Sequence, residues 1–107
     1  SFRSLAYTSS KAAVVGLTRS LAIELGSADV RVNAVAPSFV PTSFGGDRPE
    51  GERDRYLEHH RQMSLLNRLA TPHDIAEAVA FLASERASFI TGEVLHVAGG
   101  AQLAPAP

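Results

Sequence analysis

Residues 30–37 read VRVNAVAP, a run rich in β-branched residues that ends at a proline. Such a run predicts a β-strand over residues 30–36, which Pro37 ends because proline lacks the N–H that a ladder needs. The apolar density beyond Arg31 favours burial on both faces, as in a parallel sheet. Asn33 is the exception. Because a buried amide must be hydrogen-bonded, we expect Asn33 to fasten the strand to an adjacent loop.

A long helix is predicted before this strand, over residues 6–26. Its larger apolar residues recur at helical spacing, at Val14, Leu17, Leu21 and Leu25. Alanines fill much of the remainder and permit close packing against a neighbouring helix or sheet. Gly26 follows the last leucine and is expected to be the left-handed cap of the helix.

A second helix and a second strand are predicted towards the end of the chain. Thr71 is a good N-cap, Pro72 suits the first helical position, and Asp74 stands where a capping-box acid belongs. The pattern predicts a helix over residues 72–84. Residues 93–98 are rich in valine and leucine and indicate the last strand, which Gly99 and Gly100 end.

The stretch between these parts, residues 37–70, is interrupted by prolines and glycines. A long insertion of this kind is typical of a functional lid or of disorder, and its apolar residues favour a lid. A short helix from Glu52 to Met63 fits the pattern. The adjacent His59 and His60 point in different directions, so they make a poor metal pair and are interpreted as part of a solvated helix face. No metal site is predicted.

The order helix, strand, lid, helix, strand predicts an α/β fold with a right-handed crossover between parallel strands. A two-stranded parallel sheet is not self-sufficient, because parallel sheets are normally wider and covered on both faces. The strand at residues 30–36 would also have a bare edge that invites pairing with another segment or chain. We therefore expect residues 1–107 to form a single partial domain, the carboxyl-terminal half of a doubly wound sheet whose amino-terminal half is absent.

Composition narrows the possible functions. The 107 residues are 45% hydrophobic and 20% charged, as in an ordinary globular protein. A net charge of −1 gives no electrostatic case for binding nucleic acid or an anionic membrane. The absence of cysteine excludes disulfides and thiolate chemistry. The sequence has no apolar run long enough for a membrane span and no signal peptide, so a cytoplasmic location is expected. The start at Ser1 favours a fragment or a processed product.

Tyr7 and Lys11 form the candidate catalytic pair. Residues four apart lie on one face of a helix, so the lysine ammonium would sit near the phenol and favour the phenolate, as proton transfer requires. Lys11 is also the only lysine among ten basic residues. The alternative is a half-buried tyrosine that packs near a helix start.

Four stretches resemble, in order and spacing, the short-chain dehydrogenase/reductase family, which are nicotinamide-dependent oxidoreductases on a Rossmann-like fold. These stretches are YTSSK at residues 7–11, RVNAVAP at 31–37, VPT at 40–42 and ITGEVLHVAGG at 90–100. The segment RLATPHDIA at 68–76 also resembles the family's entry to its last long helix. The resemblance covers nearly the whole chain.

The resemblance implies a role for each matched residue. Tyr7 would be the acid or base that exchanges a proton with a carbonyl or alcohol substrate, and Lys11 would favour its phenolate and bind the nicotinamide ribose. The cofactor, NAD or NADP, would be bound by Tyr7, Lys11, Pro37, Ser38, Val40 and Thr42. The variable substrate lid would include Phe39, Phe44, Met63 and Leu66.

The sequence departs from the family in several places. The glycine-rich phosphate loop and the residue that selects NAD or NADP do not occur in these 107 residues, and the catalytic serine would precede Ser1. Ser38 stands where glycine is usual, which would strain a backbone of positive φ, and Ala98 stands where aspartate is frequent. We therefore expect the isolated chain to be inactive.

A second hypothesis is a non-catalytic oligomerisation or interaction module derived from such an enzyme. The resemblance implies a homo-oligomer that assembles through the helix at residues 6–26 and through the last helix and strand. A third interpretation is a truncated product of a longer enzyme. The sequence does not identify the substrate, although its apolar lid residues favour one with some hydrophobic surface.

Overall fold

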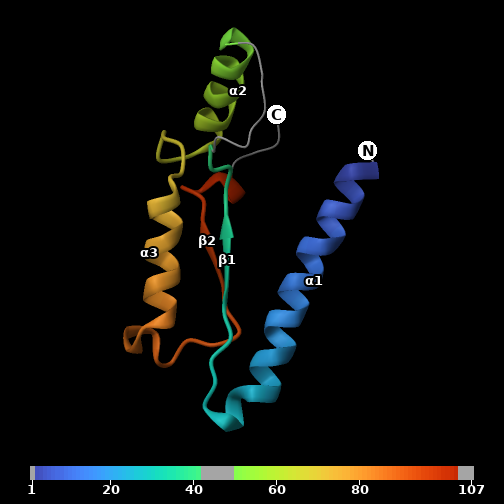
Figure 1. Cartoon of the computed structure of the whole chain (residues 1–107), viewed down its shortest axis with the longest axis vertical. Coiled ribbons are helices and arrows are strands. Elements are labelled where there is room, and N and C mark those ends of the chain that lie inside the picture. Colours follow the sequence, from blue (N-terminus) through green and yellow to red (C-terminus); the bar gives the residue numbers. More distant parts are fainter. Residues whose placement is uncertain (1, 42–49, 104–107) are drawn as a thin grey trace. The chain divides into compact units, whose positions relative to one another are not determined.

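A computed structural model describes residues 2–41 and 50–103. Figure 1 shows the order of its elements. The helices are α1 (Phe2–Leu25), α2 (Glu50–Met63) and α3 (Pro72–Ala83), and the strands are β1 (Ala34–Pro37) and β2 (Val94–Val97). Short 3₁₀ turns are η1 (Gly26–Ala28), η3 (Glu85–Ala87) and η4 (Ala101–Leu103). Within the described ranges, no helix has both the length and the apolarity needed to cross a membrane.

The described residues group into two compact units, where the sequence predicts a single partial domain. The first unit comprises Ser1–Val35 and Ala80–Leu95, and the second comprises Ala36–Val79 and His96–Pro107. Few apolar side chains in the described part of the chain are buried. They are Ala22, Leu82 and Ala87 in the first unit and Ala98 in the second.

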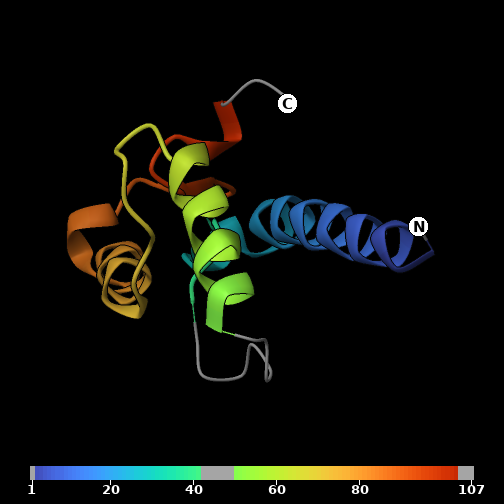
Figure 2. The same ribbon diagram turned by 90° about the horizontal axis from the view of Figure 1, so that it is seen from above.

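In the first unit, α1 begins at Phe2, four residues before the predicted start, and forms an unbroken coil in Figure 2. The prediction that Gly26 is its left-handed cap is wrong. The chain instead continues through η1, and Asp29 takes the left-handed conformation with φ 60° and ψ 36°. The Asp29 N–H donates to the Gly26 carbonyl at 3.0 Å, and aspartate tolerates this conformation better than most residues.

The buried face of α1 is made of small residues rather than of the predicted leucine stripe. Thr18 is 6% exposed and Ala22 is 8% exposed, whereas Val14 and Leu17 are more than half exposed. The Thr18 hydroxyl donates to the Val14 carbonyl at 2.7 Å, which satisfies it inside the helix. Ala22 approaches Gly92 so closely that a Cβ at that glycine would lie 3.4 Å from the alanine Cβ. This face of α1 therefore packs through small side chains.

β1 and β2 form a two-stranded sheet and run in the same direction (Figure 1). The Ala34 N–H donates to the Glu93 carbonyl at 2.9 Å in the first unit, and the Ser38 N–H donates to the Val97 carbonyl at 3.3 Å in the second. Both strands are shorter than the predicted residues 30–36 and 93–98. The residues of β1 are half-buried and Pro37 is exposed, so the expected burial on both faces is not found within this chain.

Asn33 fastens the approach to β1 to the loop before β2, as the sequence predicts. Its Nδ2 donates to the Ile90 carbonyl at 2.9 Å, and its Oδ1 accepts from the Glu93 N–H at 3.0 Å. One side chain thus satisfies a donor and an acceptor of a segment that is distant in the sequence.

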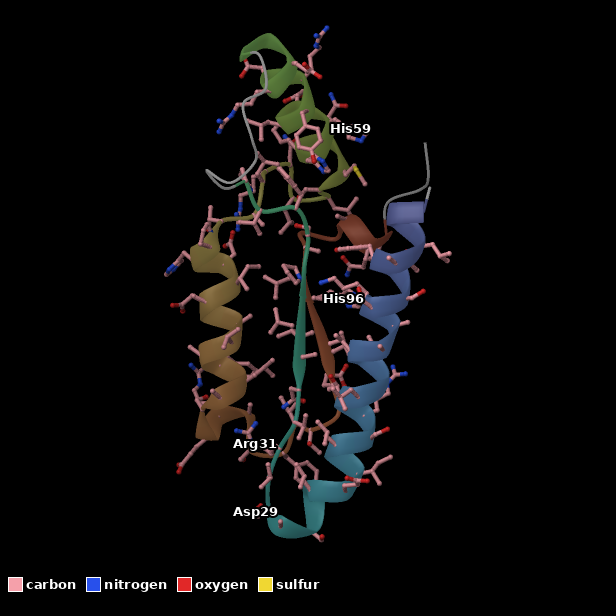
Figure 3. The ribbon with its side chains drawn as sticks, turned by 45° about the vertical axis from the view of Figure 1, so that its right-hand side comes forward. Asp29, Arg31, His59 and His96 are labelled. Carbon is pink, nitrogen blue, oxygen red and sulfur yellow. The ribbon has the colours of Figure 1, made fainter. Side chains whose placement is uncertain are left out.

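Arg31 holds the end of α3 in the first unit. Its guanidinium donates to the Leu82 carbonyl at 2.7 Å and to the Ser84 carbonyl at 3.1 Å. Figure 3 places Arg31 next to Asp29, at the turn that joins α1 to β1. A cation that satisfies terminal carbonyls stabilises a helix C-terminus, so Arg31 caps α3.

Candidate functional site

Tyr7 and Lys11 lie on one face of α1, as their spacing predicts. The Lys11 Nζ is 5.3 Å from the centroid of the Tyr7 ring. Tyr7 is 64% exposed. The Ser10 hydroxyl donates to the Tyr7 carbonyl at 2.8 Å, which is a contact within the helix backbone and leaves the phenol untouched. The pair therefore places a phenol, which can donate a proton, next to an ammonium group.

The residues expected to line the nicotinamide belong to the second unit, whereas Tyr7 and Lys11 belong to the first. Pro37 ends β1 and is exposed, and Ser38 continues the ladder to β2. Ser38 does not have a positive φ, so serine in place of the usual glycine brings no left-handed strain. Val40 is half-buried. The predicted cofactor residue Thr42 lies outside the described residues.

A cavity of about 210 Å³ opens in the second unit, where both strands end. In α/β proteins ligands bind beyond the carboxyl ends of the strands. Ser38 follows β1, and Val97 and Ala98 lie at the end of β2. The cavity is lined by Ser38, Ser64, Leu66, Arg68, Ala70, Asp74, His96, Val97, Ala98 and Gly99.

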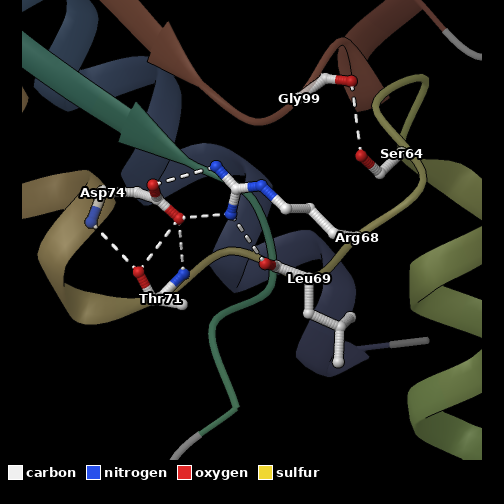
Figure 4. A network of polar contacts seen from close by, with 6 residues as sticks. All are labelled: Ser64, Arg68, Leu69, Thr71, Asp74 and Gly99. Carbon is white, nitrogen blue, oxygen red and sulfur yellow. Dashed lines mark hydrogen bonds and ion pairs between the residues drawn. The ribbon is translucent and has the colours of Figure 1, made fainter.

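Two of the residues that line the cavity, Arg68 and Asp74, form a network of polar contacts with Thr71 (Figure 4). The Arg68 guanidinium donates to both carboxylate oxygens of Asp74, at 2.8 and 3.0 Å. The Asp74 carboxylate also accepts the Thr71 N–H at 2.8 Å, while the Thr71 hydroxyl accepts the Asp74 N–H at 3.2 Å. These two reciprocal bonds are the predicted capping box of α3.

The charge of this network is set by the same contacts. The Arg68 hydrogen bond, followed by the Thr71 backbone N–H, holds the pKa of Asp74 well below its usual range. The hydrogen bond to Asp74 in turn raises the pKa of Arg68. Because the two groups neutralise each other, the network presents an ion pair rather than a free charge.

The predicted lid residues have different surroundings. The Phe39 ring stacks on His60 of α2, with centroids 4.1 Å apart and planes 16° from parallel. Met63 is 38% exposed and Leu66 is 68% exposed, and Leu66 also lines the cavity. Phe44 lies outside the described residues. The interpretation of both histidines as a solvated face is wrong for His60, although His59 is exposed.

Sequence reasoning did not identify Ser64 and His96 as cavity residues or Arg31 as a helix cap. His96 belongs to β2 and appears in Figure 3 beside the strand. The position of His96 near the carboxyl end of the predicted last strand, where α/β proteins bind ligands, could have indicated that it lines the cavity. Among residues 2–41 and 50–103, no group of three or more metal-ligating side chains could hold an ion.

The family model described as enoyl-(acyl carrier protein) reductase matches residues 2–102. The chain is 51% identical over 94 residues to the short-chain dehydrogenase/reductase SDRA of Arabidopsis thaliana, covering 88% of this chain and 36% of that protein. The chain belongs to the short-chain dehydrogenase/reductase family. It is also 45% identical over 94 residues to the 3-oxoacyl-[acyl-carrier-protein] reductase FabG of Aquifex aeolicus, with the same coverage of 88% and 36%.

Solved structures of the family confirm the predicted fold class, the carboxyl-terminal half of a Rossmann-like α/β domain. A short chain dehydrogenase family protein from Francisella tularensis matches with a TM-score of 0.79 and 34% identity, over 92% of this chain and 43% of that one. The short-chain dehydrogenase/reductase relatives are oxidoreductases by name. The chain spans a little over a third of the length of these curated relatives.

Proposed function

We propose that this chain supplies the proton-transfer part of an oxidoreductase that interconverts a carbonyl and an alcohol. The observation that carries the proposal is the Tyr7–Lys11 pair, with the ammonium 5.3 Å from the ring centroid on an exposed helix face. During reduction the Tyr7 hydroxyl gives its proton to the substrate carbonyl oxygen, and during oxidation the phenolate takes it back. Lys11 stabilises the phenolate through its charge.

We propose that the cofactor is a nicotinamide dinucleotide, NAD or NADP. Lys11 offers an ammonium with three donors for ribose hydroxyls, and Tyr7, which is exposed, lies on the same helix face. The segment that begins at Pro37 starts at the carboxyl end of β1, where α/β proteins bind ligands. Pro37, Ser38, Val40 and Thr42 would hold the nicotinamide end. The bound cofactor would supply the hydride.

For the substrate we propose a 3-oxoacyl or 3-hydroxyacyl thioester. One relative is named as a 3-oxoacyl-[acyl-carrier-protein] reductase and another, from Thauera aromatica, as a hydroxy(phenyl)methylsuccinyl-CoA dehydrogenase subunit. The exposed Met63 and Leu66 of this chain offer apolar surface that an acyl or aryl group would cover.

A chimera tests the role of Tyr7. Residues 2–102 replace the matching segment of the Aquifex aeolicus relative, and acetoacetyl-CoA reduction is followed by nicotinamide absorbance with each cofactor. Loss of a general acid lowers the rate by about 10²–10⁴-fold, so Tyr7→Phe should lower kcat/KM by that factor. Ser20→Ala, which removes an exposed hydroxyl from the same helix, should leave it unchanged. Equal activity of Tyr7→Phe and Ser20→Ala would refute the proposed role.

We further propose that the 107 residues alone do not turn over substrate. Their sequence contains no glycine-rich loop to hold the cofactor phosphates, and that contact supplies much of the binding free energy of a dinucleotide. Nicotinamide turnover by the purified chain that Tyr7→Phe abolishes would contradict this expectation.

A second candidate function is assembly into a homo-oligomer through α1 and through α3 with β2. It is supported by the exposed apolar side chains of these helices, which include Leu17 at 59% and Ile23 at 82% on α1 and Val79 at 49% on α3. Light scattering at micromolar concentration should show a dimer or larger species. Leu17→Glu should lower the mass, whereas Thr8→Glu, on the opposite side of the same helix, should not. A wild-type monomer would exclude this function.

A further inference from the structure

Phe39, Tyr56 and His60 form a closed cluster of three aromatic rings in the second unit, which we name the ring cluster. Phe39 stacks on His60, and Tyr56 meets Phe39 edge-on, with centroids 5.2 Å apart and planes at 89°. Tyr56 also meets His60 edge-on, at 4.6 Å and 74°. Stacked and edge-to-face arrangements are the favourable geometries of aromatic pairs. Each of the three rings therefore makes a favourable contact with both of the others.

The ring cluster joins two segments that are separate in the chain. Tyr56 and His60 are four residues apart on α2, so they share one face of that helix. Phe39 comes from the segment that follows β1. All three side chains are half-buried, whereas the neighbouring His59 is exposed. The cluster thus fixes one face of α2 against the segment beyond the carboxyl end of β1.

The carboxyl-terminal end of α2 is held by a second set of contacts. The Gly99 carbonyl accepts the Leu65 N–H at 2.8 Å and the Leu66 N–H at 3.3 Å. Gly99 has a φ of +57°, and a Cβ there would lie 2.5 Å from the Ser64 hydroxyl oxygen. Figure 4 shows Ser64 directed towards Gly99. The chain after α2 is therefore pressed against the turn that follows β2.

From these contacts we infer that Phe39 is a positioning residue that fixes α2 before any ligand binds. Its ring already lies against α2, while Met63 and Leu66 remain exposed for a ligand. The inference rests on the proposed function only for the identity of that ligand. The position of α2 in the free chain is measurable without any activity.

Nuclear magnetic resonance of the ligand-free, isotopically labelled chain tests this inference. An aromatic ring face shifts protons above it upfield, so the His60 ring protons should resonate upfield of those of His59, His73 and His96. Phe39→Leu should remove this shift, and Phe39→Tyr should keep it because the ring remains. Phe89→Leu is the matched control, since the Phe89 side chain is fully exposed. If Phe39→Leu leaves the His60 signals unchanged, the ring is not seated on His60 and the inference fails.

Amide hydrogen exchange separates positioning of α2 from general loss of structure. Phe39→Leu should speed exchange in α2 by about tenfold or more, while residues 72–79 of α3 in the same unit keep their wild-type rates. Phe39→Tyr should restore the slow exchange of α2. Unprotected α2 amides in the wild-type chain, equal rates for the leucine and tyrosine variants, or equal acceleration in α3 would each overturn the inference. None of these outcomes depends on the role of Tyr7.

Discussion

Replacing Gly100 by alanine tests how tightly the turn after β2 packs on the chain that follows α2. Gly100 has a φ of +81°, and a Cβ there would lie 2.6 Å from Leu65 Cδ1 and 3.1 Å from Leu65 Cβ. The left-handed conformation costs an alanine roughly 1–2 kcal/mol. Overpacking costs about 1–3 kcal/mol, towards the lower end here because the tip of Leu65 can rotate. We expect Gly100→Ala to lower the free energy of unfolding by about 3 kcal/mol.

Urea unfolding followed by far-UV circular dichroism measures this loss. Gly51→Ala is the matched control because it lies in α2 of the same unit, where a Cβ meets nothing within 4 Å. It should stabilise the chain by up to about 1 kcal/mol, since alanine favours a helix. In a Leu65→Ala background the two nearest clashes, with Leu65 Cγ and Cδ1, are gone, so the cost of Gly100→Ala should fall towards the conformational part, about 1–2 kcal/mol. A loss for Gly100→Ala that is below about 0.5 kcal/mol, or that is unchanged without the Leu65 side chain, would refute the packing argument.

Three further predictions concern polar contacts. Arg31→Met should lower the free energy of unfolding by about 2 kcal/mol, because two charge-assisted bonds to the end of α3 are lost, and Arg31→Lys should recover only part of it in urea titrations. At neutral pH, Asn33→Asp should destabilise the folded chain as much as Asn33→Ala does, because the aspartate has no N–H to donate to the Ile90 carbonyl. Thermal unfolding of both variants would check this. The pKa of Asp74 is lowered in the folded chain. The ionised Asp74 carboxylate therefore contributes its full stabilisation of the folded state above about pH 4 and progressively less at lower pH. The difference in urea midpoint between wild type and Asp74→Asn should therefore shrink from neutral pH towards about pH 3.

Contacts within one helical turn could be predicted from the sequence. The Thr71–Asp74 capping box and the Tyr7–Lys11 pair depend on spacings of three and four residues, which helix geometry converts directly into proximity. Asn33 was predictable for another reason, because an amide inside an apolar strand must find partners. The fold class also followed from element order, because strands joined by long helical connections are parallel.

Long-range contacts could not be predicted in the same way. The carbonyl that Arg31 binds at Leu82 is 51 positions away, and no local pattern indicates which helix end an arginine will reach. His60 was taken for a solvated residue because its partner, Phe39, comes from the segment after β1. Gly26 was a plausible helix cap, but the 3₁₀ turn of η1 moved the left-handed position to Asp29.

Several apolar side chains of α1, the helix that carries Tyr7 and Lys11, are exposed. Val14, Leu17 and Ile23 are each at least half exposed, and burying such a side chain fully contributes about 1.5–3 kcal/mol. Val14 and Leu17 are three residues apart and lie on one side of the helix, so a surface that covers both would stabilise α1 by about 2–3 kcal/mol. The same helix carries Tyr7 and Lys11, so a partner that stabilises α1 also stabilises the arrangement of the proposed proton donor and the charge beside it. By mass action, the population of that arrangement would then depend on the concentration of the partner that covers α1.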